Sequence, residues 1–403
     1  MRSPEADAGA AARSPPLAGL LGLGMGVGTV NGLSRVAMPL FAVSLGAQSW
    51  QVGIVGGLGY AGILMLALPT GAWIDRHGSR PMFLRGTFAG ALLYLLLPLL
   101  HTPVQVIVAA ALLGLALPLR TIPVHTEFLA LLPRLSASRA GWNRAATTLG
   151  MFFLGPAMAA TIMAALGFAP VFQLAACVLL AAQLLARKVL TEDGVAGQIG
   201  DQSLSDRIRA QLALLRTHPD VRRTMGIDFL AQMTVAYFTV FGLILAVRRF
   251  GMPLQAAAGL VTLQGALYVV TLFAGGALVL RWKEDIRYLA AFLLLLGQTL
   301  LYGLATGPAA LWLGAAMSGV GLGLQGLTST ARFAGFMARH GRGRIGGLTS
   351  LGPPAGGVIG AMLGGLVSQR LGTEAGFLIL ASACALVCVA QVRRLRPRPA
   401  ADR

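Results

Sequence analysis

The stretch Gly71-Ala72-Trp73-Ile74-Asp75-Arg76-His77-Gly78-Ser79-Arg80-Pro81 joins two long apolar runs, at residues 51–74 and 82–100. Each run has about the length of a helix that crosses a membrane, because roughly 20 apolar residues span a hydrocarbon core about 30 Å thick. The junction itself carries one aspartate and two arginines. We therefore expect a tight polar loop between two membrane helices.

Ten further apolar runs continue this pattern in both directions. They lie at residues 17–43, 104–123, 145–166, 168–186, 225–247, 255–280, 288–305, 308–331, 345–368 and 375–392. The chain is 56% hydrophobic and only 11% charged, a composition that suits a lipid-facing surface. We expect an all-α integral membrane protein with twelve transmembrane helices in two six-helix bundles.

A polar stretch from Thr191 to Arg223 separates the two sets of six runs. The expected organisation is a cytoplasmic tail (1–16), an N-terminal bundle (17–190), a linker (191–223), a C-terminal bundle (224–393) and a basic cytoplasmic tail (394–403). In the linker, Leu204, Ile208, Leu212 and Leu215 have helical spacing, which predicts an amphipathic helix on the membrane surface.

Basic residues gather in every second loop. The basic loops contain Arg76, Arg80 and Arg85; Arg134, Arg139 and Arg144; Arg281, Lys283 and Arg287; and Arg339, Arg342 and Arg344, whereas the other loops hold only Arg248, Arg249 and Arg370. Short loops rich in Lys and Arg remain in the cytoplasm. We therefore expect a multi-pass protein of the cytoplasmic (inner) membrane with both termini in the cytoplasm.

The formal net charge of +18 follows from this topology and from attraction to anionic lipid. Because the charges are spread over loops and do not form one soluble face, no nucleic-acid partner is expected. The first apolar run is too long for a removable signal peptide, and Glu5 and Asp7 precede it. Three cysteines, Cys177, Cys384 and Cys388, lie in apolar runs and are interpreted as packing residues.

The two halves repeat each other. An offset of 205 positions aligns Gly46 with Gly251, Gly71 with Gly276, Arg76 with Arg281 and Gly114 with Gly319. Two composite patterns also recur: Arg139-x-Gly141-x-x-Arg144 matches Arg339-x-Gly341-x-x-Arg344, and Gly150-x-x-x-Leu154-Gly155-Pro156 matches Gly347-x-x-x-Leu351-Gly352-Pro353. Transporters are commonly built from such repeats, so we expect bundles related by pseudo-two-fold symmetry.

The stretch at 71–81 resembles motif A of the major facilitator superfamily, with Trp73 and Ser79 as departures. The resemblance implies a secondary transporter with a cytoplasmic gate formed by Gly71, Asp75, Arg76, Gly78 and Arg80 against Arg344, at the start of the eleventh helix. A carboxylate can accept hydrogen bonds from the free amides of a helix N-terminus, which suits a latch. The alternative is that these charges only fix the topology.

A second resemblance concerns the direction of transport. The segment around Gly155 and Pro156 is similar to motif C of exporters in this superfamily, and Gly352, Pro353 and Gly356 repeat it in the eleventh helix. Efflux is therefore favoured, although helix packing explains Gly and Pro in membrane helices almost as well. The residues after Arg120, Thr121-Ile122-Pro123, depart from the exporter motif B and argue against a drug–proton antiporter.

Polar residues inside the apolar runs are the expected substrate contacts, because intramembrane polar groups usually face a cavity or a partner. The residues expected to bind substrate are Asn31, Arg35, Arg120, Gln232, Tyr237, Gln264, Tyr268 and Gln325. In the family, helices one, four, seven and ten line the cavity, and most of these residues lie on them.

Arg35 lies near mid-membrane, about 15 Å before the outer loop. Its guanidinium is expected to bind an anionic substrate group, with internal pairing or snorkelling as alternatives. Arg120 lies closer to the inner end of its helix, where snorkelling is the favoured interpretation. Proton coupling needs a titratable group, and Glu127 and Asp228 are the candidates, with His125 as an interfacial alternative. Anion exchange or facilitated diffusion would need neither acid.

The chain contains no zinc-protease, nucleophile-elbow, Cys/His metal or ATP-binding loop pattern, so neither an enzyme nor a cofactor is expected. The expected function is secondary active efflux of a small organic molecule by alternating access, with an anionic substrate and protons as expected partners. Uptake or exchange of an anionic metabolite is the alternative, and a non-transporting sensor or assembly factor is the alternative of another class. The protein is expected to be a monomer.

Overall fold

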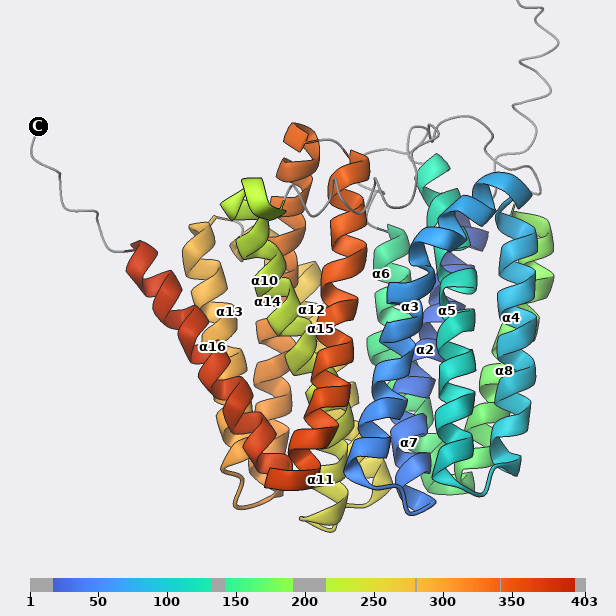
Figure 1. Ribbon diagram of the computed structural model, residues 1–403, viewed down its shortest axis with the longest axis horizontal. Coiled ribbons are helices and arrows are strands. Elements are labelled where there is room, and N and C mark those ends of the chain that lie inside the picture. The colour runs from blue at the N-terminus through green and yellow to red at the C-terminus, as the bar shows by residue number, and fades with distance from the viewer. Residues whose placement is uncertain (1–16, 132–141, 191–214, 280, 341, 396–403) are drawn as a thin grey trace, which may run out of the picture.

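The computed structural model describes residues 17–131, 142–190, 215–279, 281–340 and 342–395. Over these residues all regular structure is helical, and the elements stand side by side as a two-part bundle (Figure 1). The amphipathic helix expected at 204–215 lies almost wholly outside the described residues, as do both terminal tails.

The first half contains six spans. These are α2 (Leu17–Ser44), α3 (Ser49–His77), α4 (Ser79–Leu96), α5 (Pro103–Leu131), the continuous α6 (Trp142–Leu149), η4 (Gly150–Leu154) and α7 (Gly155–Leu166), and α8 (Phe168–Val189). The segment η4 is a π-helical turn in which the Gly155 amide bonds to the Gly150 carbonyl. Pro156 follows directly, and a wider turn before a proline accommodates its missing N–H.

The second half repeats the arrangement. Its spans are the continuous α10 (Pro219–Tyr237), η5 (Phe238–Gly242) and α11 (Leu243–Arg248), then α12 (Leu254–Val279), α13 (Glu284–Gly303), α14 (Pro308–His340), α15 (Arg342–Leu371) and α16 (Thr373–Leu395). Among the described residues, 11 helices are long and apolar enough to cross a membrane. The 30-residue α15 completes the set, and the predicted twelve-helix, two-bundle fold is confirmed.

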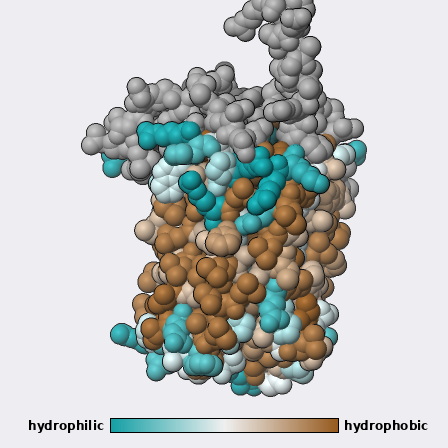
Figure 2. Space-filling model, turned by 90° about the vertical axis from the view of Figure 1, so that its right-hand side faces the viewer, coloured by the Kyte–Doolittle hydropathy of each residue, from teal (hydrophilic) through white to brown (hydrophobic). Residues whose placement is uncertain are grey.

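The lateral surface agrees with a membrane environment. Figure 2 shows a wide hydrophobic band across the middle of one face, with hydrophilic side chains gathered toward both ends. Large apolar side chains are exposed on this kind of surface, such as Phe88, Leu112, Leu313 and Leu386. Such an extent of exposed apolar surface is stable only in contact with lipid.

Several helices extend further than their apolar runs. The helix α5 passes through Pro118 and Pro123 and ends at Leu131, eight residues beyond its predicted end. The apolar run at 104–123 ends before Glu127, whereas in the structure Glu127 belongs to α5. Neighbouring helices and adjusted turns can satisfy the backbone groups that an internal proline frees, so the proline did not end the helix.

Corresponding helices pack alike in the two bundles. The helix α3 packs on α5 as α12 does on α14, and α4 packs on α8 as α13 does on α16. Two glycine pairs from the 205-residue offset play matching roles. Gly46 and Gly251 both have positive φ, 82° and 60°, and an added Cβ at Gly114 or Gly319 would lie 2.4 Å from a carbonyl oxygen of the facing helix.

The two bundles touch at one end of the molecule. We call the end where α8 finishes and α10 begins the linker end, which is uppermost in Figure 1, and the opposite end the loop end. At the loop end, the Ser49 amide bonds to Gln369 Oε1 at 3.2 Å, and a Cβ on Gly53 would lie 2.5 Å from the Ala361 carbonyl oxygen. Further along α3, a Cβ on Gly71 would meet nothing within 4 Å among the described residues, and α3 and α15 diverge toward the linker end in Figure 1. The bundles are therefore closed against each other at the loop end and separate toward the linker end.

Candidate substrate site between the bundles

A cavity of about 420 Å³ lies between the bundles. Its wall comes mainly from the C-terminal bundle, on α10, α12, α14 and α15, and Phe152 of η4 contributes from the other side. The lining residues are Phe152, Asp228, Ala231, Gln232, Val235, Tyr268, Leu322, Gln325, Gly326, Ser329, Thr330, Phe333 and Pro353. The structure thus brings together Gln232, Tyr268, Gln325 and Asp228 around one cavity, and their roles in substrate binding and coupling stay predictions.

A three-residue bridge joins the bundles beside this cavity. Arg35 Nη2 donates a hydrogen bond to the Tyr60 hydroxyl oxygen at 2.7 Å, and Gln232 Nε2 donates to the same oxygen at 3.2 Å. Arg35 and Tyr60 lie on α2 and α3, whereas Gln232 lies on α10. We call this set the central bridge.

The Arg35 guanidinium is also held by aromatic faces. Its central carbon lies 5.7 Å from the centre of the Tyr60 ring and 5.1 Å from that of Phe152. The Phe152 ring in turn lies 4.9 Å from the Tyr268 ring. Ring faces attract a cation, more strongly where water is excluded. Among the described residues no carboxylate bonds Arg35, so neutral groups alone hold this charge.

Asp228 is anchored at the wall of the cavity. It accepts a hydrogen bond from Gln325 Nε2 at 2.5 Å and another from the Ser329 hydroxyl. The Tyr288 hydroxyl lies 3.0 Å from Ser329 Oγ. Both donors come from neighbouring turns of one helix, α14.

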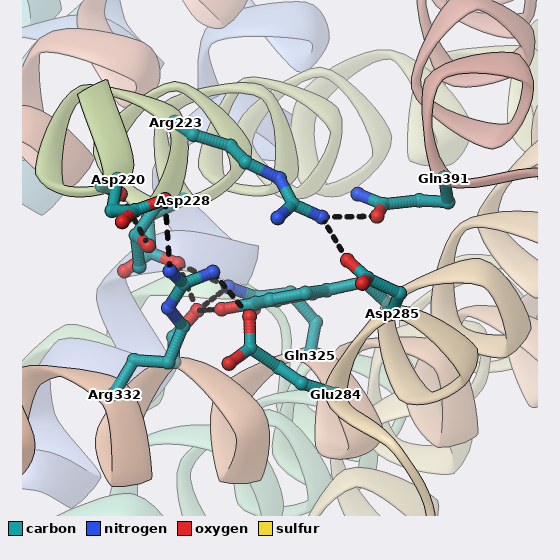
Figure 3. A network of polar contacts seen from close by, with 11 residues as sticks. Asp220, Arg223, Asp228, Glu284, Asp285, Gln325, Arg332 and Gln391 are labelled. Carbon is teal, nitrogen blue, oxygen red and sulfur yellow. Dashed lines mark hydrogen bonds and ion pairs between the residues drawn. The ribbon is translucent and has the colours of Figure 1, made fainter. Parts of the chain in front are cut away.

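Ion pairs lie beside Asp228 at the linker end of the C-terminal bundle (Figure 3). Arg332 pairs with Glu284 and lies 3.7 Å from Asp220. Arg223 pairs with Asp285 at 2.5 Å and bonds Gln391. The network joins α10, α13, α14 and α16 within one bundle. Sequence reasoning missed it, although Glu284 and Asp285 lie in the segment that the 205-residue offset aligns with residues 71–81.

Arg120 lies inside the N-terminal bundle. Its side chain is 2% exposed, and Nη2 donates to Asn31 Oδ1 at 3.1 Å. Its Nε and Nη1 have no hydrogen-bond partner among the described residues. The favoured snorkelling interpretation is wrong, because α5 continues three turns beyond Arg120 and leaves the residue deep in the bundle.

A second cavity, of about 350 Å³, lies beside Arg120. Its walls come from α2, α5 and α6, and its lining residues are Gly24, Val27, Arg120, Thr121, Val124, His125, Asn143, Thr147 and Thr148. Asn31, one turn from Arg35 on α2, therefore connects the Arg120 region with the helix that carries the central bridge.

Three predicted site residues lie elsewhere. Tyr237 is 2% exposed and donates to the Thr373 carbonyl oxygen at 2.7 Å, and Gln264 is 1% exposed and donates to Ser318 Oγ at 2.8 Å. Glu127 is 6% exposed. None of the three lines either described cavity.

The expected cytoplasmic gate is described only in part. The side chains of Asp75 and Arg344 lie outside the described residues, so their contact stays a prediction. Gly78 has φ of 84° and connects α3 to α4, while Arg76 is exposed and Arg80 half-buried.

The motif C-like residues pack helices within each bundle. A Cβ on Gly155 would lie 2.5 Å from the Thr29 carbonyl oxygen of α2, and one on Gly356 would lie 2.2 Å from the Phe229 carbonyl oxygen of α10. Gly352 faces Met225 of α10 in the same way. Pro156 and Pro353 adjoin these contacts, so a packing role accounts for the whole pattern.

The cysteines divide into two groups. Cys384 and Cys388 are buried in the C-terminal bundle, as expected for packing residues, whereas Cys177 is exposed. Within the part of the chain that the structure describes, no group of His, Cys, Asp and Glu is arranged to hold a metal ion.

Two membrane-spanning bundles around a central cavity define a membrane transporter, and not an enzyme. The chain belongs to the major facilitator superfamily, whose family model matches residues 20–352. Its fold is similar to two crystal structures of the nucleoside transporter NupG, one of them a point mutant. The mutant has a TM-score of 0.74 at 15% identity, and the other structure has 0.73 at 14%. Each comparison covers 94% of this chain and 98% of the other. No curated protein sequence matches the chain.

Proposed function

We propose that this protein is a secondary active transporter that exports a small organic anion across the cytoplasmic membrane by alternating access. The observation that carries the proposal is the cavity beside Arg35, closed toward the loop end by α3 and α15. A site that reaches one side at a time is what alternating access requires.

The linker end is proposed to be cytoplasmic, because the basic loops of the sequence belong to it. The described state would then be open to the cytoplasm and closed to the outside. An exporter in this state is ready to take up its substrate.

An anionic substrate is supported by the surroundings of Arg35. A guanidinium forms its strongest hydrogen bonds with carboxylate or phosphate, and Arg35 has a neutral hydroxyl and two ring faces instead. The aromatic side chains of Phe152 and Tyr268 and the amides of Gln232 and Gln325 suit a compound with a flat ring and polar substituents. Nucleosides therefore also belong among the compounds to test, because the two similar structures are of a nucleoside transporter.

Asp228 is proposed as the proton-coupling carboxylate. It lines the cavity, where a proton can reach it, whereas Glu127 is buried outside both cavities. Protonation would weaken the bonds that Gln325 and Ser329 donate to it. A charge that changes during the cycle is what proton coupling needs.

Uptake or exchange of an anionic metabolite is the second candidate function. It is favoured by the sequence after Arg120, Thr121-Ile122-Pro123, which departs from the exporter motif B, and by the packing role of the motif C-like glycines.

Radiotracer uptake into inside-out vesicles tests the proposal. The panel contains aromatic carboxylates, nucleosides and aromatic cations, each measured with and without a proton gradient. We expect carboxylates to accumulate only with the gradient. Accumulation of cations that Arg35→Gln leaves unchanged would contradict an anion exporter, and accumulation only in right-side-out vesicles would establish uptake.

The proposed latch has its own test. In proteoliposomes, Asp75→Asn is expected to reduce transport and to increase the population that is open at the linker end, measured by the distance between spin labels. Arg85→Gln, another basic-loop change, serves as the control. Normal transport with wild-type populations in Asp75→Asn would leave these charges a topological role only. Transport of nothing on the panel by reconstituted protein would favour a sensor or assembly factor, and size-exclusion with light scattering tests the proposed monomer.

A further inference from the structure

The central bridge lies where the closed interface between the bundles ends. From Ser49 to Tyr60, α3 contacts α15 repeatedly, and the last of these contacts is the Tyr60 ring against Gly357, where a Cβ would lie 2.6 Å from the ring. Beyond Tyr60, α3 and α15 diverge toward the linker end (Figure 1), and among the described residues a Cβ on Gly71 would meet nothing within 4 Å. Tyr60 therefore lies at the floor of the opening, between the cavity and the closed interface.

The position of the Tyr60 hydroxyl is determined on both sides. Its ring is confined by Gly357 of α15, and its oxygen accepts bonds from Arg35 of α2 and Gln232 of α10. One oxygen atom thus links both bundles. If it moves away from either donor, the polar link between α2 and α10 is lost.

The same guanidinium lies next to the cavity, because the Phe152 ring that it contacts lines the cavity wall. Arg35 has five N–H donors, and the only hydrogen bond described for it is the one to Tyr60. A carboxylate accepts two parallel N–H bonds from a guanidinium, and these are stronger than a bond to a neutral hydroxyl. A carboxylate that reaches Arg35 therefore competes with the Tyr60 hydroxyl and forms the stronger hydrogen bonds.

We propose that the Tyr60 hydroxyl holds Arg35 in place of the substrate anion, and that a carboxylate displaces it and so releases the central bridge between the bundles. This inference rests on the proposed function, because it assigns the substrate a carboxylate beside an aromatic ring that lies against Phe152. It also makes Tyr60 a positioning residue that couples occupancy of the cavity to opening at the loop end.

The proposed displacement also predicts the direction in which anion binding shifts the equilibrium between the two states of the bundles. A ligand shifts a conformational equilibrium only by its difference in affinity between the two states. In the described state the anion must displace a Tyr60 hydroxyl that Gln232 and Gly357 of the other bundle hold in place, whereas in a state open at the loop end Tyr60 has lost both contacts and turns away from Arg35 more easily. The anion therefore favours opening at the loop end, which is the step that an exporter must make after loading.

Binding of benzoate to the full-length protein in lipid nanodiscs tests the competition. Benzamide, which has nearly the same shape without the charge, is the reference ligand. Tyr60→Phe removes only the hydroxyl and leaves the ring on Gly357. Tyr60→Phe removes a neutral hydrogen bond that opposes binding, so its affinity for benzoate should be roughly two- to tenfold higher. Arg35→Gln should abolish the preference for benzoate over benzamide.

Tyr94→Phe is the matched control. The Tyr94 ring also faces an arginine, with its centre 5.9 Å from the Arg120 guanidinium carbon, but its buried hydroxyl has no hydrogen-bond partner among the described residues. Its removal should leave the affinity for benzoate unchanged.

Opening at the loop end is measured separately, by spin labels on His101→Cys and Thr306→Cys in a Cys177→Ala background. Both positions are exposed at the loop end, one in each bundle. Benzoate should increase the long-distance population of the protein that carries only the labelling changes, and Tyr60→Phe should show that increase without any ligand.

The proposal is overturned if benzoate binds no better than benzamide, or if Tyr60→Phe matches Tyr94→Phe in affinity and distance. Neither measurement requires transport. If Tyr60→Phe changes the affinity and the distance as expected but the vesicles show no transport, only the proposed function is rejected. If the vesicles show transport but Tyr60→Phe changes neither the affinity nor the distance, only the proposed displacement is rejected.

Discussion

Arg35 and Arg120 both lie within membrane helices, but the groups that surround their guanidinium charges differ. Arg35 lies beside a cavity, with two ring faces and a hydroxyl around it. Arg120 is 2% exposed and lines the second cavity, with one amide oxygen as its hydrogen-bond acceptor and, among the described residues, two donor nitrogens without a partner. A buried charge without full compensation lowers stability, so we expect Arg120 to reduce the stability of the fold more than Arg35 does.

Arg120→Met is expected to stabilise the protein. Methionine fills a similar volume without donors, which removes the penalty of the unsatisfied nitrogens, about 1–3 kcal/mol. The measurement is thermal unfolding of the detergent-solubilised protein. Arg35→Met serves as the control and should gain less, because its aromatic and hydroxyl contacts are lost. A lower melting temperature for Arg120→Met would indicate that the guanidinium is compensated by a group such as bound water or an anion.

Asp228→Asn is expected to uncouple transport from the proton gradient. The amide keeps the size of the side chain and an oxygen that can accept the hydrogen bonds of Gln325 and Ser329, but it does not take up a proton at the pH of the assay. Stimulation of vesicle accumulation by the gradient should disappear, while exchange of labelled for unlabelled substrate continues. Glu127→Gln, outside both cavities, should keep its stimulation, and the reverse result would assign the coupling to Glu127.

At the scale of single residues, the sequence predicts which side chains are unusual but not what they touch. A lone arginine in an apolar run identifies Arg35, and Gln232 and Gln325 are found in the same way. The partner Tyr60 is a polar residue of the next helix, 25 positions from Arg35, and Phe152 lies on the fifth span, but nothing in the sequence indicates that either meets Arg35. Ser329 could have been found, because it lies one turn after Gln325 on the same face.

At the scale of helices, glycines determine how closely neighbours approach. Along α15, Gly356 and Gly360 place the helix against backbone carbonyl oxygens of α10, at 2.2 and 2.3 Å from an added Cβ. Small residues allow membrane helices to pack backbone to backbone. This packing lies within the C-terminal bundle, so these glycines stabilise the bundle itself.

Gly356→Ala is therefore expected to destabilise the protein by about 1–3 kcal/mol, because α15 must move away from α10. The matched change is Gly226→Ala on α10, where an added Cβ meets nothing within 4 Å. That change should be neutral or stabilising by up to about 1 kcal/mol, since alanine favours the helix. Thermal unfolding of both variants checks the pair, and equal losses would mean that the close contact is not maintained.

The positions of the helices were predictable and their linker ends were not. Apolar runs locate all twelve spans within a few residues on the loop side. On the linker side, α5, α14 and α10 extend beyond the apolar run into residues such as Glu127, Arg332 and Asp220. Hydropathy measures what lipid covers, whereas the helix continues wherever its backbone and ion pairs are satisfied.

At the scale of the whole molecule, the two ends differ in how the bundles are held. The ion pairs of Arg332 and Arg223 stay within the C-terminal bundle at the linker end. At the loop end, Arg248 Nη2 of one bundle bonds the Ala47 carbonyl oxygen of the other at 3.0 Å. Movement between states must therefore break contacts at the loop end while each bundle moves as a unit.

Cross-linking the loop end is expected to stop transport. Ser49 and Gln369 face each other across the bundles, with the Ser49 amide 3.2 Å from Gln369 Oε1. In a Cys177→Ala background, Ser49→Cys with Gln369→Cys is joined by a short reagent that reacts with two thiols, and the mass shift measures completeness.

A control cross-link within one bundle distinguishes the effect of locking the loop end from damage caused by the reagent. The His101 amide bonds Gln105 Oε1 at 2.9 Å, the same kind of contact, but both residues belong to the N-terminal bundle. His101→Cys with Gln105→Cys should accept the same reagent and continue to transport in proteoliposomes. Since α3 and α15 separate only if the loop end opens, full transport by the completely cross-linked Ser49→Cys/Gln369→Cys protein would exclude rocking of the bundles as its mechanism.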